Sequence, residues 1–130
     1  MAPIELGDRL ELLIDDHLTD TLMGSASRKM HHPVVREVVI RHDESWEGGG
    51  SNYHTVFQDG DIFRMYYRGA HFALKDGKFS QAHPQVTCYA ESIDGIHWEK
   101  PELGLFEWEG SKKNNIVWAT EKSTHNFAPF

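Results

Sequence analysis

The stretch YHTVFQDGDIFRMYYR, residues 53–68, decides the fold of this chain. Its two halves are rich in aromatic and β-branched residues, which favour β-strands. Between them stands Asp59-Gly60, a strong short-range signal for a β-hairpin turn. The sequence therefore predicts a strand over 53–58, a tight turn, and a partner strand over 62–68.

Further strands are predicted on both sides of this hairpin. Residues 69–84 form a long connection with a second turn signal at Asp76-Gly77. A third strand over 85–92 leads through Asp94-Gly95 into a fourth over 96–99, which Pro101 ends. Shorter strands are expected over 9–14, 34–41, 105–108, 114–118 and 127–130.

The predicted fold class is all-β: an antiparallel four-stranded meander with an N-terminal strand strap. No segment of helical length has apolar residues at positions i, i+3, i+4 and i+7 together with capping residues. A closed sandwich fits less well, because the strands follow one another without a Greek-key return. The last strand, 127–130, would also leave an apolar edge without a partner.

Composition and charge exclude several classes of protein. The 20 acidic and 13 basic residues give a formal net charge of −7 without a long Lys/Arg block, so neither nucleic acid nor an anionic membrane is expected as a partner. The apolar runs are too short for a transmembrane helix, and no secretory signal is visible, which favours a cytoplasmic location. A single cysteine, Cys88, excludes an internal disulfide framework and a Cys-based zinc cluster.

Several segments together resemble the opening of a five-bladed β-propeller of the glycoside hydrolase type, as in families 32, 43, 68 and 130. The likeness is greatest to a group of bacterial family 32-like glycosyl hydrolases. Its central pattern, within 53–98, is an apolar strand, an Asp-Gly turn, a Tyr-Tyr strand and Ala-x-Ser-x-Asp-Gly-x-x-Trp. The flanking matches are LIDDHL (13–18), WEG (46–48), NNIVW (114–118) and HNFAPF (125–130).

This resemblance implies a division of the chain into three parts. Residues 1–50 would form an N-terminal strap with a Gly-rich loop, 51–118 the first blade and its connection, and 119–130 the first strand of the next blade. The chain would then be the N-terminal segment of a carbohydrate-active protein that hydrolyses or binds a glycan. The pattern is specific for blade architecture and not for one substrate.

Two carboxylates are the candidate catalytic residues, because glycoside hydrolysis needs a proton donor and a carboxylate that acts as base or nucleophile. Asp16 follows a predicted apolar strand, as the family 32 nucleophile does, and Glu47 precedes the predicted innermost strand. Each also has a plainer interpretation: Asp16 as a turn residue, and Glu47 as a solvent-exposed loop acid. Tyr53 stands where family 43 has an Asp, and the partner carboxylate is expected beyond Phe130.

The candidate substrate-binding residues are Trp46, Tyr53, His54, His125 and Asn126. His54 and His125 lie on strands predicted at the inner wall, where imidazoles can donate hydrogen bonds to sugar hydroxyls. Asn126 resembles the polar head of a later inner strand, and the rings of Trp46 and Tyr53 could stack on a sugar. Structural roles in the core or in the hydrogen-bond network are equally open for these side chains.

Two other functions stay open. A non-catalytic β-sheet module for carbohydrate binding or assembly would use the same hairpins, and its exposed strand edges would allow homo-oligomers. A small His-rich metal barrel ranks third, because the 9 histidines include no His-x-His pair. No cofactor and no metal are expected.

Overall fold

The computed structural model describes residues 3–120, 124, 127 and 129. The chain divides into two compact units, Met1–Arg36 and Glu37–Phe130. No helix occurs among the described residues, so none there could cross a membrane. The prediction of an all-β chain with antiparallel sheets is confirmed.

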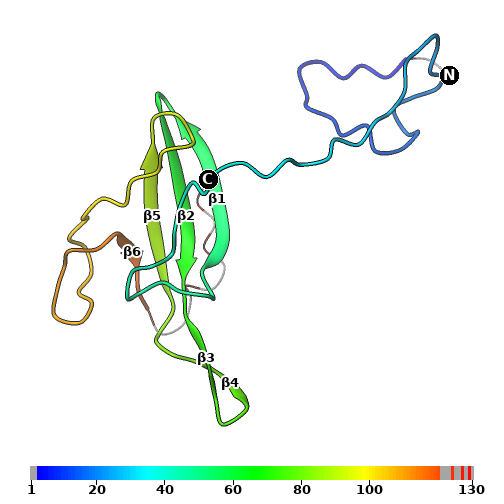
Figure 1. Ribbon diagram of the computed structural model, residues 1–130. Coiled ribbons are helices and arrows are strands. Elements are labelled where there is room, and N and C mark those ends of the chain that lie inside the picture. The colour runs from blue at the N-terminus through cyan, green and yellow to red at the C-terminus, as the bar shows by residue number, and fades with distance from the viewer. Residues whose placement is uncertain (1–2, 121–123, 125–126, 128, 130) are drawn as a thin grey trace. The chain divides into compact units, whose positions relative to one another are not determined.

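Six strands in the second unit form two antiparallel sheets (Figure 1). The strands are β1 (Asn52–Asp59), β2 (Ile62–Gly69), β3 (Phe72–Lys75), β4 (Lys78–Gln81), β5 (Val86–Ser92) and β6 (Ile116–Trp118). The larger sheet has the order β1-β2-β5-β6, a meander interrupted by the β3-β4 hairpin. The expected four-stranded antiparallel sheet is observed. No closed sheet occurs in the part of the chain that the structure describes.

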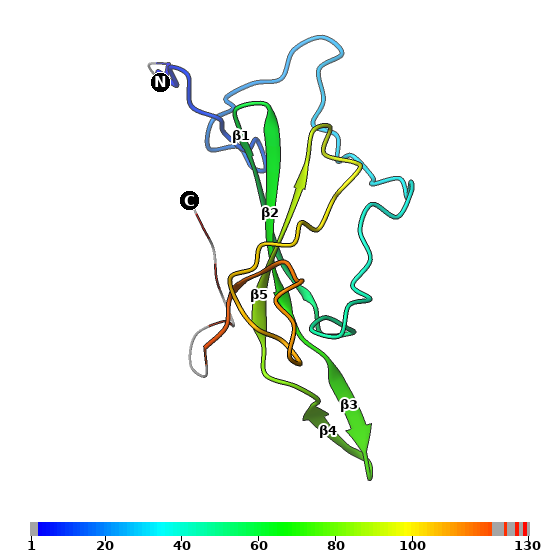
Figure 2. The same ribbon diagram turned by 90° about the vertical axis from the view of Figure 1, so that its left-hand side faces the viewer.

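The predicted central hairpin is confirmed. Asp59 pairs with Ile62, and Gly60 has a φ of 61°, a left-handed conformation that glycine adopts without steric cost. β5 then pairs along β2, with Tyr66 opposite Tyr89. The turn signal in the expected connection 69–84 corresponds to a full hairpin, β3-β4, which extends from the end of β2 away from the larger sheet (Figures 1 and 2).

Four expected strands are absent. The segments 9–14, 34–41, 96–99 and 105–108 do not form strands, so the strand strap was wrong and the fourth strand of the sheet is β6. In 96–99 the amides of Ile96 and His97 donate to the Asp94 carboxylate instead of to a neighbouring strand, at 2.8 Å each. In 9–14 the apolar side chains are exposed, as in Leu10 and Leu12, and none of the described strands pairs with this segment. The strand expected over 127–130 falls largely outside the described residues.

The core lies on one face of the larger sheet. Its buried side chains are Met65, Tyr67, Val86, Cys88, Ala90 and Ile116. Three tryptophans, Trp46, Trp98 and Trp108, pack against this cluster from the segments that cover it. Gly69 at the end of β2 allows a close approach of backbone to backbone: a Cβ atom there would lie 2.6 Å from the carbonyl oxygen of Trp46. The absence of a side chain at Gly69 therefore lets the loop that carries Glu47 lie directly on the sheet.

Candidate functional site

Loop 41–51 crosses the core face of the sheet, and glycines allow its tight path. The Gly50 amide donates to the carbonyl of Ala70 at 3.0 Å, and the Ser51 amide donates to the carbonyl of Gly48 at 2.9 Å. Gly48 has a φ of 138° and a Cβ atom there would overlap His71. This path turns the side chain of Glu47 inward, toward the sheet.

Glu47 is the centre of a buried polar cluster. It is only 2% exposed, so the interpretation of this residue as a solvent-exposed loop acid was wrong. Its Oε1 accepts from the Tyr67 hydroxyl at 2.5 Å, and its Oε2 accepts from Lys100 Nζ at 2.7 Å and from the Glu44 amide at 3.2 Å. Both oxygens therefore have donors from the protein.

The Glu47 carboxylate stays ionised. Burial by itself would raise its pKa, but the contacts with His42, Lys100 and Tyr67 outweigh burial and lower the pKa from 4.5 to about 2. Burial and the nearby Glu47 charge raise the pKa of the Tyr67 phenol, so this group remains a hydrogen-bond donor. The arrangement suits a base, a nucleophile or an electrostatic anchor, and not a general acid.

Two imidazoles lie beside this carboxylate. Nε2 of His42 and Nε2 of His54 are 2.9 Å apart, and His42 Nδ1 lies 3.7 Å from Glu47 Oε1. The Tyr67 ring contacts both imidazoles, with centroid distances of 4.8 Å to His42 and 5.5 Å to His54. His54, on the edge strand β1, is exposed, whereas His42 is largely covered. The site thus connects a buried carboxylate to an exposed imidazole.

Asn115 fixes the other side of the cluster. Its amide donates to the Tyr67 hydroxyl oxygen at 2.8 Å and to the Tyr89 carbonyl at 2.6 Å, and its carbonyl accepts from Trp46 Nε1 at 2.8 Å. The indole of Trp46, expected as a sugar-stacking platform, is thus hydrogen-bonded to Asn115 and packs on the core.

Two more histidines hold the backbone of the same loop. His71 Nδ1 accepts from the Gly49 amide at 3.3 Å, and His83 Nε2 lies 3.3 Å from the carbonyl oxygen of Glu47. Trp108 packs edge-on against His83, at a centroid distance of 5.0 Å. Two of the nine histidines thus contact the backbone of the loop that carries Glu47.

The remaining candidate residues lie elsewhere. Tyr53 is the second residue of β1 and has a φ of 57°. It is half exposed, and the Arg68 guanidinium lies 4.6 Å from its ring centroid. His125 and Asn126 lie outside the described residues. Their expected contacts with a substrate stay predictions.

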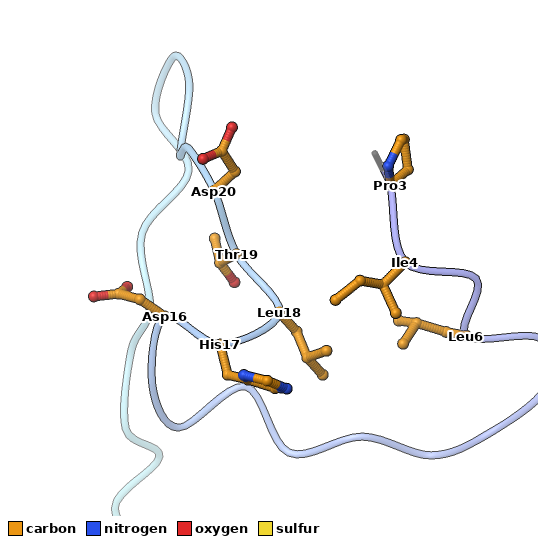
Figure 3. Close-up of a pocket in the computed structure, with 8 residues that line it drawn as sticks. All are labelled: Pro3, Ile4, Leu6, Asp16, His17, Leu18, Thr19 and Asp20. Carbon is orange, nitrogen blue, oxygen red and sulfur yellow. The ribbon is translucent and has the colours of Figure 1, made fainter. Parts of the chain in front are cut away.

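Asp16 belongs to the first unit, not to the unit that carries Glu47. It lies beside a cavity of about 730 Å³ within that unit, lined by Pro3, Ile4, Leu6, Asp16, His17, Leu18, Thr19 and Asp20 (Figure 3). Figure 3 shows its carboxylate pointing away from Ile4 and Leu6. Asp16 forms an ion pair with Arg28, and its carbonyl accepts from the Thr19 amide, which is the pattern of a turn residue.

The predicted structural turn after β5 is present. Ser92 Oγ donates to the Asp94 carboxylate at 3.0 Å, and Trp98 Nε1 donates to the Gly95 carbonyl at 3.0 Å. The hydrogen bond from His97 is the main cause of the lowered pKa of Asp94. This carboxylate is engaged in forming the turn.

Sequence reasoning missed His42 and Lys100 as members of the site. Lys100 lies 53 positions from Glu47, and it contacts that residue only because the segment after β5 returns to the loop. No short motif marks such a pair. Among the described residues there is no group of three or more His, Cys, Asp or Glu side chains arranged to hold a metal ion.

Comparison with known proteins gives a partial likeness. The chain is 38% identical over 60 residues to two Mycobacterium tuberculosis proteins, "Uncharacterized protein MT1551" of strain CDC 1551 / Oshkosh and "Uncharacterized protein Rv1502" of strain ATCC 25618 / H37Rv. The match covers 46% of this chain and 19% of each relative. No family model matches the chain, and no solved structure matches it. The chain thus spans about a fifth of the length of the curated relatives that it resembles.

Proposed function

We propose that this chain is the N-terminal segment of a carbohydrate-active β-propeller protein that hydrolyses or binds a glycan. The observation that carries the proposal is the ionised Glu47 carboxylate, buried on a glycine-rich loop beside the exposed imidazole of His54. A carboxylate that keeps its charge suits the base or nucleophile of glycoside hydrolysis, and a nearby imidazole can donate to a sugar hydroxyl.

The four-stranded antiparallel sheet supports the architectural part of the proposal. Propellers repeat sheets of this kind around a central channel. In that arrangement β1 would be the innermost strand of its blade, and His54 on β1 would face the channel.

The test uses the protein encoded by the whole reading frame, incubated with a panel of oligosaccharides and assayed for released reducing sugar and for binding by calorimetry. If the proposal holds, at least one glycan is cleaved or bound, and Glu47→Gln or His54→Ala weakens that response. Asp76→Asn is the matched control, because it removes a carboxylate from the exposed β3-β4 turn, where Asn tolerates the φ of 51°. Absence of both cleavage and binding over the panel contradicts the proposal.

A non-catalytic carbohydrate-binding or assembly module is the second candidate. It is favoured by the protein donors on both oxygens of Glu47, which give this carboxylate a structural role. This alternative predicts glycan binding that survives Glu47→Gln and Asp16→Asn, without any release of reducing sugar. Cleavage that is lost in Glu47→Gln while the protein stays folded would exclude it.

A further inference from the structure

The contact between His42 and His54 restricts where their hydrogens can be. The two Nε2 atoms are 2.9 Å apart, a hydrogen-bond distance, so one of them donates and the other accepts. A hydrogen on both atoms at once would place two donors against each other. The contact therefore accommodates one hydrogen and not two.

The second nitrogen of His42, Nδ1, indicates which of the two rings donates in this contact. His42 Nδ1 is buried and has no hydrogen-bond partner among the described residues, but it lies 3.7 Å from Glu47 Oε1. A lone pair on Nδ1 would face a negative oxygen, so an N–H is favoured at this position. Neutral His42 then presents its Nε2 lone pair to the Nε2–H of His54.

Charged and titratable groups lie near the pair. Glu47 on the loop and the ring of Tyr67 on β2 contact it directly. Lys100, on the segment after β5, binds Glu47 and Asp43, and Cys88 on β5 lies near Glu47. Lys100 binds Glu47 Oε2 at 2.7 Å and lies 3.4 Å from Asp43 Oδ1. Glu47 is thus neutralised by Lys100 at one oxygen and faces His42 at the other.

A first proton leaves the contact intact. The singly charged pair still has one hydrogen between the two Nε2 atoms, whichever ring carries the charge. A second proton needs a hydrogen on both Nε2 atoms and puts two positive charges next to each other. His42 is then retained by Glu47, and His54, on an edge strand, is the ring that is able to turn outward.

We infer that the His42–His54 pair separates when it takes up its second proton, so that the His54 imidazole becomes free of His42 only at acidic pH. Burial and the charge of His42 lower the pKa of His54, which agrees with a disfavoured second proton. The pairing itself follows from the geometry. Its consequence for glycans, that a sugar hydroxyl gains the full contact of His54 only in acid, rests on the proposed function.

The test is an NMR titration of the histidine ring signals of the whole chain, without glycan. His97 is the internal reference, because it is exposed and hydrogen-bonded to Asp94 away from the pair. We expect His54 to titrate below His97, because burial and His42 lower the pKa of His54 while the Asp94 carboxylate raises that of His97. In His42→Gln, which takes up no charge, the His54 midpoint should rise and that of His97 should stay unchanged.

A His54 midpoint at or above that of His97 in the unmodified protein overturns the inference, and so does an unchanged His54 midpoint in folded His42→Gln. If His42→Gln does not fold, the titration of the unmodified protein decides alone. Because no glycan is present, this outcome is independent of the success or failure of the proposed function.

Discussion

Glu47 is the residue whose charge matters most for stability. In Glu47→Gln the largely covered Lys100 ammonium loses its buried counter-charge, and we expect the free energy of unfolding to fall by about 3 kcal/mol. Asp59→Asn also replaces a carboxylate by an amide, in an ion pair with Arg64. The Asp59 side chain is 59% exposed, so the loss of unfolding free energy should stay below about 1 kcal/mol. Urea denaturation of both variants measures the difference, and equal losses would contradict the burial argument.

Acid should destabilise the fold in two stages. The folded pKa of His54 lies below its ordinary value of 6.5, so the unfolded chain binds this proton first and stability begins to fall below that pH. The pKa of Glu47 falls from 4.5 to about 2 on folding, so its contribution is complete above 4.5 and is lost as the pH approaches 2. Urea midpoints measured from pH 7 to pH 2 should show both stages, and Glu47→Gln should lack the lower one.

Sequence alone identified Glu47 and His54 as candidates, but it did not predict their surroundings. The Gly run after Glu47 signals a flexible loop, and flexibility favours exposure. The observed burial depends on Lys100 and Asn115, which are distant in sequence, and on the missing side chain at Gly69. Contacts of this kind leave no local pattern.

Among the elements, β2 depends on Gly69. An alanine Cβ there would lie 2.6 Å from the Trp46 carbonyl oxygen and 2.9 Å from Cys88 Sγ, so Gly69→Ala must displace the loop or the strand. We expect it to destabilise the protein by about 2 kcal/mol and to shift the indole signal of Trp46. Gly49→Ala is the control, because nothing lies within 4 Å of its Cβ position, and its effect should stay within about 0.5 kcal/mol.

The accuracy of the strand predictions follows from whether a partner was available. β1 and β2 were predicted well because the Asp59-Gly60 turn brings them together, and β5 because the β3-β4 hairpin returns the chain to β2. The segment 34–41 has equally strong β-propensity, yet it forms no strand, since no neighbouring strand supplies hydrogen bonds. β-propensity thus shows which segments are able to form strands, and hydrogen bonding to a neighbouring strand decides which of them do.

At the scale of the whole molecule, the sheet and the Glu47 cluster are both built within residues 37–130. A chain that starts at Glu37 is therefore expected to keep the β-sheet circular dichroism signal and the low-pH titration of His54. The comparison of its NMR spectrum with that of the full chain is the measurement. Loss of the sheet signals in the shorter chain would show that Met1–Arg36 is needed for folding.

The single thiol of the molecule gives a way to measure its opening without a denaturant. Cys88 is fully buried at the centre of the sheet, under Gly69, and burial raises the pKa of its thiol. An alkylating reagent can therefore react only when the covering segments leave the core face or the sheet itself opens, and the labelling rate reports how often this happens. Because labelling adds mass at one known position, a mass spectrometer can follow the kinetics of this opening in physiological buffer.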